Sequence, residues 1–194
     1  MTARHAVSVL VHEGLVFRVQ GKGTFVARNK VVRGLEEFSG LYDDLISQGL
    51  NPGSRVLHLR RRLANDLERS ELDLGLSPEV WDVKRIRAVN GVPIALQEFV
   101  VPVDLVPHLD EIDLAKRSFY GYLRDIGLPL VGARQRIEAV CDPDVSQLLE
   151  VSGGSPLLRV ERVSYLEDGR AVERLVSNFL GDAYSYEANL GSTP

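Results

Sequence analysis

The 194-residue sequence has a single cysteine, Cys141, which excludes an internal disulfide bond. Its four histidines are scattered, so no group has the spacing of a metal site, and we expect no metal or other cofactor. No apolar run approaches the ~20 residues that a membrane-spanning helix needs, and Met1 is not followed by an apolar signal segment. We therefore expect a cytoplasmic protein without a membrane partner.

Catalytic motifs are equally scarce. The Gly21–Thr24 stretch is not a P-loop, because glycine follows the lysine and the earlier glycine is missing. His12-Glu13 lacks the second histidine of a metalloprotease helix. A catalytic pair of Arg87 and Glu98 would have no nucleophile beside it. The sequence therefore does not predict an enzyme.

The composition, 44% hydrophobic and 26% charged, is that of a globular protein with one good core and a small appendage. Charge is unevenly distributed along the chain. Residues 1–33 contain six Lys or Arg and one acid, a net +5, whereas the whole chain carries -4, so the remainder carries -9. This asymmetry indicates a nucleic-acid-facing end attached to a domain that does not contact nucleic acid.

The basic end contains a short helix and a hairpin. Apolar periodicity over 2–13 stops at Gly14, which is typical of a helix C-terminus. Residues 15–27 then alternate as two short strands around a glycine-rich turn that carries Lys22. A helix followed by such a ribbon is typical of the second half of a winged helix-turn-helix, in which the wing reaches toward phosphates. An ordinary surface hairpin is the alternative, and the surrounding positive charge disfavours it.

The remainder predicts an α+β domain with one antiparallel sheet covered by helices. Residues 28–34 are basic, lack a helical stripe and are interpreted as a linker. Asn90-Gly91 and Asp168-Gly169 are turn signals of two long hairpins. The expected helices cover 38–46, 64–73, 119–126 and 142–150, and the expected strands cover 54–63, 80–101 as a hairpin, 131–140, 157–180 as a hairpin, and 183–190.

The first hairpin carries the strongest candidate site. If Asn90 and Gly91 are the two turn residues, the residue numbers of each cross-strand pair add up to 181. Arg85, Arg87 and Glu98 then share one face. If that face is exposed to solvent, the arginines are ordinary surface residues. If it is concave and covered, two guanidiniums two residues apart form an anion clamp, and Glu98 accepts hydrogen bonds from ligand hydroxyl or amine groups.

Two further positions add polar groups. Ser118 begins a helix, so it is either a plain N-cap beside core aromatic residues or, with the Tyr120 phenol, part of an anion-binding corner. In the second hairpin, the residue numbers of each cross-strand pair add up to 337. This places Glu173 opposite Ser164 and on the same face as Arg162. An Arg162–Glu173 ion pair would be a sufficient structural explanation for that arrangement.

Two resemblances to known protein families together cover nearly the whole chain. The run from Thr2-Ala3-Arg4 to Gly21-Lys22-Gly23-Thr24-Phe25-Val26-Ala27 resembles the recognition helix and wing of GntR-family transcription regulators. The rest resembles the UTRA sensor domain of the HutC-type subfamily. The matching pieces are Arg85-Ile86-Arg87 before Pro93, Glu98 before Pro102, Ser118-Phe119-Tyr120 before Gly127, Pro156-Leu157-Leu158, and Asp168-Gly169 ahead of Glu173 with Gly181-Asp182 and Tyr184 following.

The resemblance implies a chorismate-lyase-like fold for 35–194, a partial winged helix-turn-helix over 1–27 and a homodimer that binds operator DNA. It implies a small-molecule effector, such as a sugar phosphate, amino acid or organic acid, that controls DNA binding through the linker. The implied effector-binding residues are Arg85, Arg87, Glu98, Ser118, Tyr120 and Glu173. The implied DNA-binding residues are Thr2, Arg4 and Lys22.

Three departures from the family pattern bear on function. The chain begins almost inside the recognition helix, so a truncated, stand-alone effector-sensing protein without DNA binding is the alternative function. Phe179-Leu180 stands where similar proteins commonly have Tyr-Arg. Glu37 lies beside Ser39, where phosphate-binding members tend to have hydroxyl residues, and a carboxylate facing the pocket would repel a phosphate. An effector other than a sugar phosphate, such as an amino acid or organic acid, is therefore the alternative to a sugar phosphate.

Overall fold

The structure is a computed structural model that describes residues 3–12, 16–19, 23–26, 30–36, 38–76 and 78–191. Thr2, Lys22 and Glu37 lie outside the described residues, so their expected roles are not addressed by it. Arg4 lies in the first helix, which is described as a backbone element at that position.

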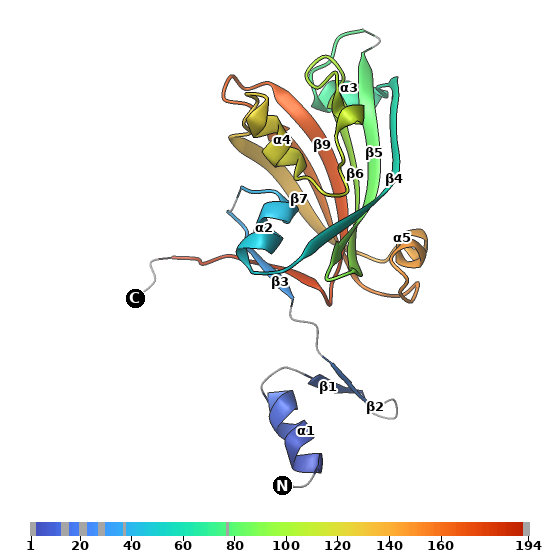
Figure 1. The fold of residues 1–194 in the computed structure, drawn as a ribbon, viewed down its shortest axis with the longest axis vertical. Coiled ribbons are helices and arrows are strands. Elements are labelled where there is room, and N and C mark those ends of the chain that lie inside the picture. The colour runs from blue at the N-terminus through green and yellow to red at the C-terminus, as the bar shows by residue number, and fades with distance from the viewer. Residues whose placement is uncertain are drawn as a thin grey trace.

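The N-terminal part is a helix followed by a hairpin, as the sequence predicts. Helix α1 spans Ala3–His12. Strands β1 (Val16–Val19) and β2 (Gly23–Val26) pair antiparallel. Figure 1 shows the helix and the hairpin near the N-terminus.

The larger domain is built on one antiparallel six-stranded sheet, which confirms the expected α+β class. Each predicted hairpin forms, and each strand starts within a few residues of its expected position. The strands are, in spatial order, β4 (Pro52–Leu63), β5 (Glu79–Val89), β6 (Val92–Pro102), β9 (Ala171–Leu180), β8 (Leu157–Tyr165) and β7 (Gly132–Val140).

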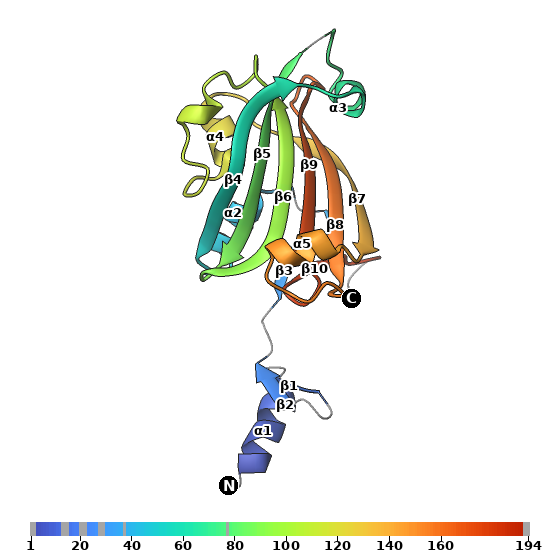
Figure 2. The same ribbon diagram turned by 90° about the vertical axis from the view of Figure 1, so that its right-hand side faces the viewer.

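Short helices cover the two faces of this sheet (Figures 1 and 2). The inner face, which carries Arg85 and Gln97, is covered by α2 (Leu41–Ser47) and α4 (Phe119–Asp125). The outer face carries Asp82 and Lys84. Its two ends are covered by α3 (Asp66–Glu71) and α5 (Pro143–Leu148), and a 3-10 turn, η1, spans Leu109–Glu111.

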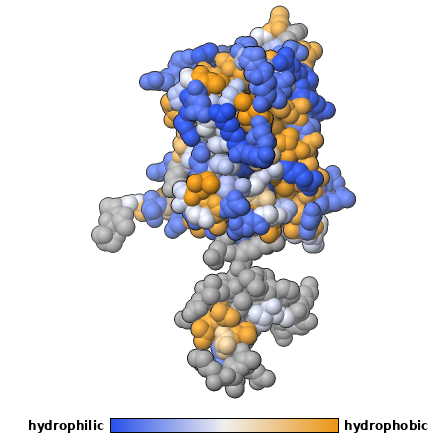
Figure 3. Space-filling model, in the orientation of Figure 1, coloured by the Kyte–Doolittle hydropathy of each residue, from blue (hydrophilic) through white to orange (hydrophobic). Residues whose placement is uncertain are grey.

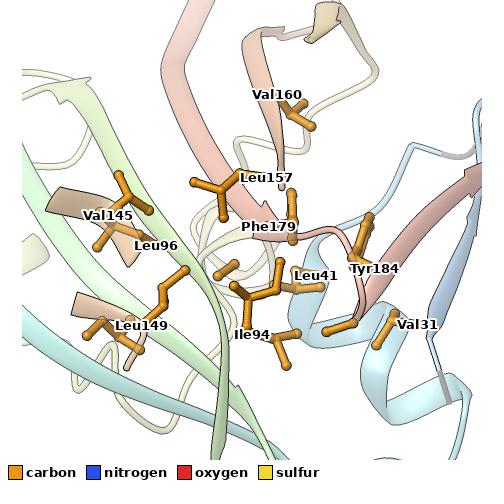
Figure 4. Packing of buried hydrophobic residues seen from close by; sticks show 14 of the residues in the cluster. Val31, Leu41, Ile94, Leu96, Val145, Leu149, Leu157, Val160, Phe179 and Tyr184 are labelled. Atoms are coloured by element: carbon orange, nitrogen blue, oxygen red, sulfur yellow. The ribbon is translucent and has the colours of Figure 1, made fainter. Parts of the chain in front are cut away.

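Apolar side chains explain why these helices dock where they do. On the inner face, Phe119 of α4 packs against Phe99 with ring centroids 4.8 Å apart. On the outer face, Val145 of α5 and Leu149, the C-cap residue of that helix, join a cluster with Leu96 (Figure 4). Burial of this apolar surface is the main favourable term in folding. The surface in the view of Figure 3 is mostly polar, with smaller apolar patches.

Part of the expected linker is instead a strand. Strand β3 (Val31–Gly34) pairs in parallel with β10 (Tyr184–Glu187), so residues distant in sequence form a two-stranded sheet beside α2. Figure 4 shows Val31 of β3 and Tyr184 of β10 close to Leu41 of α2. Apolar burial at Val31, which is 2% exposed, fixes this segment to the domain.

Burial of Arg33 also corrects the charge argument. Arg33 is 3% exposed and forms an ion pair with Asp44, with 3.4 Å between Nη1 and Oδ2. One of the six cations counted in the basic end therefore belongs to the interior of the larger domain. The excess of positive charge that remains available to contact nucleic acid is therefore smaller than the sequence suggests.

An extra residue changes the register of the first hairpin. Asn90 and Gly91 both have positive φ, 50° and 81°, as a tight two-residue turn requires, and Val89 pairs with Val92. Beyond Ala88–Pro93 the register shifts, and Arg87 pairs with Ala95, which leaves Ile94 as a β-bulge. Every residue of β6 after the bulge is therefore shifted by one position relative to the pairing expected for a regular hairpin.

The turn offers a test of the fold. Gly91→Ala should lower the free energy of unfolding by about 1 kcal/mol, because an L side chain in the left-handed region is strained. Gly75→Ala is the matched control, since an added Cβ there meets nothing within 4 Å and its φ lies outside the left-handed region. Urea unfolding measures both changes. Equal stability losses for the two variants would contradict the turn assignment.

Candidate functional site

The site is a small cavity between the inner face of the sheet and helices α2 and α4. It has a volume of ≈ 30 Å³. A cavity of this size holds about two water molecules, so a larger ligand requires the lining side chains to move apart. Its lining residues are Arg33, Ser39, Gly40, Leu41, Tyr42, Arg85, Arg87, Gln97, Ser118, Phe119, Tyr120, Val160, Arg162, Glu173, Leu175, Ser177, Phe179 and Tyr186.

Arg85 is held on strand β5 by neutral partners. Its Nε donates to Gln97 Oε1 at 3.2 Å, and its Nη1 donates to the Leu114 carbonyl at 3.4 Å. Gln97 in turn donates to Ser177 Oγ at 3.2 Å. Burial, together with repulsion from nearby Arg87, lowers the pKa of Arg85 to about 9. The guanidinium is therefore oriented, but its charge is not neutralised by a direct carboxylate contact.

Arg87 is the least satisfied polar side chain of the cavity. It is 1% exposed, and its Nε and Nη2 have no hydrogen-bond partner among the described residues. Its guanidinium carbon lies 5.8 Å from the centroid of the Tyr42 ring, a cation–π contact. Burial lowers the pKa of Arg87 to about 10. Buried donors are almost always paired in proteins, so these two nitrogens indicate a binding position.

A buried carboxyl group forms the opposite wall. Glu173 is 2% exposed, and its Oε2 accepts hydrogen bonds from the Tyr120 hydroxyl at 2.7 Å and Ser164 Oγ at 3.2 Å. Burial raises the pKa of Glu173, and the hydrogen bonds and the charges of Arg162 and Arg85 offset only part of this effect. The same burial, reinforced by the Glu173 charge, raises the pKa of the Tyr120 phenol.

Two other cations of the cavity have polar partners. Besides its ion pair with Asp44, Arg33 donates from Nη2 to the Ser39 carbonyl at 2.5 Å. Arg162 donates from Nε and Nη2 to Gln135 Oε1, at 3.2 Å and 2.7 Å. Arg33 comes from β3 and Arg162 from β8, so the walls of the cavity combine distant parts of the chain.

Ser118 has the structural role that the sequence left open. It is the N-cap of α4, and its Oγ accepts from the Gly121 N–H at 3.0 Å. The same hydroxyl donates to Asp43 Oδ2 at 3.2 Å and so ties α4 to α2. Ser118 also lines the cavity, and its role in binding a ligand stays a prediction.

The structure brings together five of the six residues expected to bind an effector: Arg85, Arg87, Ser118, Tyr120 and Glu173. Glu98 lies elsewhere. It pairs with Lys84 on the outer face, where its Oε1 is 2.8 Å from Lys84 Nζ and its side chain is 42% exposed. The expected shared face of Arg85, Arg87 and Glu98 is wrong, because the bulge at Ile94 turns Glu98 to the other face.

The bulge puts Gln97 where Glu98 was expected. Gln97 lies opposite Arg85 and holds its guanidinium. The signal in the sequence is Pro93, since proline within a strand is found at bulges and edges. Ser164 does lie opposite Glu173, as the second hairpin predicts, but Arg162 bonds to Gln135.

An antiparallel sheet with a buried cationic cavity under two helices is suited to binding a small polar ligand. Comparison with protein families assigns the class. Residues 47–185 match the UTRA domain. The chain therefore belongs to the UTRA-domain family of GntR/HutC-type transcription regulators.

Named relatives support this assignment. The chain is 30% identical over 188 residues to the HTH-type transcriptional repressor NagR of Bacillus subtilis, covering 96% of this chain and 77% of the relative. It is 28% identical to the histidine utilization repressor of Pseudomonas putida, covering 84% and 65%. It is 27% identical to the Escherichia coli mannosyl-D-glycerate transport/metabolism system repressor MngR, covering 96% and 78%. All three relatives are named as repressors.

Solved structures have the same fold. PhnF from Mycobacterium smegmatis aligns with a TM-score of 0.82 at 26% identity, covering 98% of this chain and 84% of that chain. The C-terminal domain of the histidine utilization repressor from Pseudomonas syringae aligns with a TM-score of 0.66 at 20% identity, covering 73% and 100%. The second likeness concerns the fold alone.

The described part of the chain has neither a helix with the length and apolarity to cross a bilayer nor a group of three or more potential metal ligands.

The corrected register makes a testable distinction between neighbouring residues. Gln97→Ala should weaken ligand binding by about tenfold, because Arg85 loses the acceptor that orients it, a hydrogen bond to a charged group worth about 1.5–3 kcal/mol. Glu98→Ala should leave binding unchanged, since Glu98 lies on the outer face. Calorimetric titration with an anion that binds the wild type measures both affinities. A stronger loss for Glu98→Ala would restore the simple register.

Glu173 makes stability depend on pH. Because burial raises its folded-state pKa above the ordinary 4.5, the folded protein binds more protons than the unfolded chain between these two values. The contribution of Glu173 to stability therefore decreases as pH rises through that window. Glu173→Gln should gain stability relative to wild type as pH increases above 4.5, as measured by urea unfolding at several pH values.

Glu98→Gln is the control for this experiment, since Glu98 is an exposed carboxylate on the outer face. A stability difference between wild type and Glu173→Gln that stays constant with pH would contradict a raised pKa for Glu173.

Proposed function

We propose that this protein is a DNA-binding transcription regulator controlled by a small anionic effector that binds in the cavity on the inner face. The regulator acts as a homodimer on operator DNA. Arg85 and Arg87 bind the anionic group, and Ser118, Tyr120 and Glu173 contact the rest of the effector. Sugar phosphates, amino acids and organic acids are the candidate classes.

The buried guanidinium pair carries this proposal. Arg85 is 7% exposed and Arg87 is 1% exposed, and neither has an ion pair with a carboxylate among the described residues. Burial of a charge without a partner is costly, so a site of this kind has a functional explanation more often than a structural one. An oxyanion that accepts from both guanidiniums removes the cost, and paired donors make the contact bidentate.

The other walls indicate what the effector carries besides its anionic group. Glu173 and Tyr120 offer a carboxyl and a phenol, which suit hydroxyl or amine groups. Phe179 presents an aromatic wall, stacked on Tyr184 with ring centroids 4.0 Å apart. A phosphate ester or carboxylate with a short polar carbon skeleton fits this combination of groups better than a wholly apolar acid.

Strand β3 links the cavity to the DNA-binding part. It follows β2 along the chain, and its Arg33 lines the cavity. Arg33 bonds to the Ser39 carbonyl, next to the first turn of α2. An effector that binds one arrangement of Arg33 and Ser39 better than another shifts the position of β3 and hence of the attached helix and hairpin.

The DNA-binding part of the proposal rests on the relatives and on α1 and the hairpin. Three named relatives are repressors, and two of their matches extend over 96% of this chain, which includes that region. Arg4 in α1 is the candidate base or phosphate contact within the described residues.

Arg87→Met tests the proposal. The substitution removes the unpaired guanidinium but keeps an unbranched apolar stem, so the ligand-free protein should gain about 1 kcal/mol of stability while losing anion binding. A thermal-shift screen uses inorganic phosphate, sugar phosphates, amino acids and organic acids. A ligand at 100 times its Kd should stabilise wild type by about 2.7 kcal/mol.

Arg60→Met is the matched control, because Arg60 is 62% exposed on the outer face and Arg62 still pairs with Asp82. This variant should keep the full ligand-induced rise in Tm. A rise that survives Arg87→Met and is lost in Arg60→Met would refute the cavity as the effector site.

A further inference from the structure

Arg162 is a third buried cation of the cavity without a carboxylate partner among the described residues. It is 4% exposed and lines the cavity. Its hydrogen bonds go to neutral oxygens, to Gln135 Oε1 at 3.2 Å and 2.7 Å and to the Ser39 carbonyl at 3.5 Å. Glu173, the partner that the sequence suggests, instead accepts from the Tyr120 hydroxyl at 2.7 Å. The neutral oxygens orient the guanidinium of Arg162 without neutralising its charge, and a buried charge without an ion partner is costly.

Arg162 lies on the opposite wall of the cavity from Arg85 and Arg87. Its strand, β8, is separated from β5 by β6 and β9, as Figure 2 shows. Three interstrand spacings of ~4.8 Å put the two backbones about 14 Å apart along the sheet. Gln97 of β6 holds Arg85, whereas Gln135 of β7 holds Arg162 from the side away from β5. The two cationic positions are therefore held apart.

Hydroxyl and carboxyl groups lie between the two walls. Glu173 of β9 is close enough to both Arg162 and Arg85 for their charges to act on its carboxyl. Tyr120 donates to Glu173, and Ser177 of the same strand also lines the cavity. Groups of this kind exchange hydrogen bonds with hydroxyl groups. A ligand that reaches from one wall to the other therefore passes a lining that suits a hydroxylated carbon skeleton.

The charge of the cavity also exceeds what one anionic group neutralises. Four arginines line it against one acid, Glu173, among the described lining residues. A second carboxyl, Asp44, pairs with Arg33. Even with both carboxyls ionised, these groups hold an excess of two positive charges. A ligand with its only anionic group on the β5 pair would leave Arg162 without a counter-ion.

We infer that the effector carries two anionic groups at the ends of a short hydroxylated carbon skeleton, one bound by Arg85 and Arg87 and the other by Arg162. The inference rests on the proposed function and names the chemical class of its effector. Sugar acids with a phosphate and hydroxylated dicarboxylates share this chemistry. Arg162 is then the residue that distinguishes a doubly anionic effector from a singly anionic one.

The Ser39 carbonyl connects the second anionic position to β3. A guanidinium pairs more strongly with an oxyanion than with a neutral carbonyl, so the second anionic group displaces this carbonyl from its long contact with Arg162. Arg33 of β3 donates to the same carbonyl at 2.5 Å. The displacement therefore also changes the contacts of the strand that follows the β1–β2 hairpin along the chain.

Pairs of compounds that differ in one anionic group test the effector class. Phosphogluconate and glucitol phosphate share a six-carbon skeleton and a phosphate, but only the first has a carboxylate. Phosphoglycerate and glycerol phosphate make the same comparison on three carbons. Glucarate and gluconate compare two carboxylates with one, so a preference confined to this pair identifies a dicarboxylate, and one confined to the phosphate pairs identifies a phosphorylated acid.

In calorimetric titration of the wild type, the doubly anionic member of at least one pair should bind about tenfold more tightly than its counterpart. This is the gain expected from one further hydrogen bond between charged groups. Equal dissociation constants within all three pairs would overturn the inference. This comparison needs no variant, so it decides the question even if a substitution in the cavity prevents folding.

Arg162→Met assigns the second position. It should abolish the preference for the doubly anionic member and leave the affinity of the singly anionic member unchanged, whereas damage to the whole cavity would weaken both. Arg162→Lys keeps the charge and should retain part of the preference. A preference that survives Arg162→Met, or an equal loss for both members, would refute the assignment of Arg162.

Arg159→Met is the matched control. Arg159 lies on the same strand but belongs to the outer face with Lys84, is 35% exposed, and leaves its partner Glu161 paired with Arg136 when it is removed. This variant should keep the full preference, and circular dichroism checks that each variant is folded.

The outcomes separate the inference from the proposed function. If singly anionic compounds bind in a manner that depends on Arg87 and a second anionic group adds nothing, the doubly anionic class is wrong and the effector site stands. If no compound of any pair binds and no anion of the thermal-shift screen raises Tm, the proposed effector site itself is wrong.

Discussion

The arrangement of the cavity depends on the alternation of side chains across the sheet. Each residue along a strand faces the opposite side from its neighbour, so one extra residue exchanges the two faces for everything beyond it. Ile94 is that residue in β6, and it turns Gln97 inward and Glu98 outward. A neutral amide therefore lies opposite Arg85, and the carboxylate pairs with Lys84 in solvent. With Glu98 inside, the guanidinium would already have a protein carboxylate as its partner.

The cavity consequently keeps a positive charge that folding alone does not favour. Arg33 and Arg162 have polar partners within the chain, while Arg85 and Arg87 lie side by side without an ion pair in the described structure. Burial disfavours the charged forms and lowers the pKa values of Arg85 and Arg87 to about 9 and about 10, and repulsion from Arg87 contributes to the lowering for Arg85. Two buried guanidiniums without an ion pair lower the stability of the folded protein, and a loss of stability of this kind is common at binding sites.

Local signals in the sequence predict much of this fold. Asn90-Gly91 and Asp168-Gly169 mark both hairpins, and Ser118 and Asp142 are N-caps as expected. These features depend on a few adjacent residues, whose backbone preferences survive in the folded protein.

Other features depend on contacts between distant residues and could not be read in the same way. The parallel pairing of β3 with β10 joins 31–34 to 184–187, and no local pattern distinguishes that strand from a linker. Burial of Arg33 follows from this pairing. The register shift at Ile94 has a local sign in Pro93, but proline indicates a bulge without giving its position. Five candidate residues line the cavity, because each lies on the strand or helix face that its spacing predicts, whereas Glu98 was assigned to the wrong face because its face depends on that single shift.

The positions of the four cavity cations suggest how binding and geometry are connected. Arg85 and Arg87 lie on β5, which has a strand on each side and a helix layer above it, so their backbone is fixed. Arg33 lies on β3, which pairs with β10 and follows the β1–β2 hairpin along the chain, and Arg162 is held by Gln135 on the edge strand β7. A ligand that bridges the fixed pair to Arg33 therefore constrains β3, the strand that follows the β1–β2 hairpin along the chain. Coupling of this kind needs only a difference in ligand contacts between two positions of β3, because the ligand shifts the equilibrium by its difference in affinity.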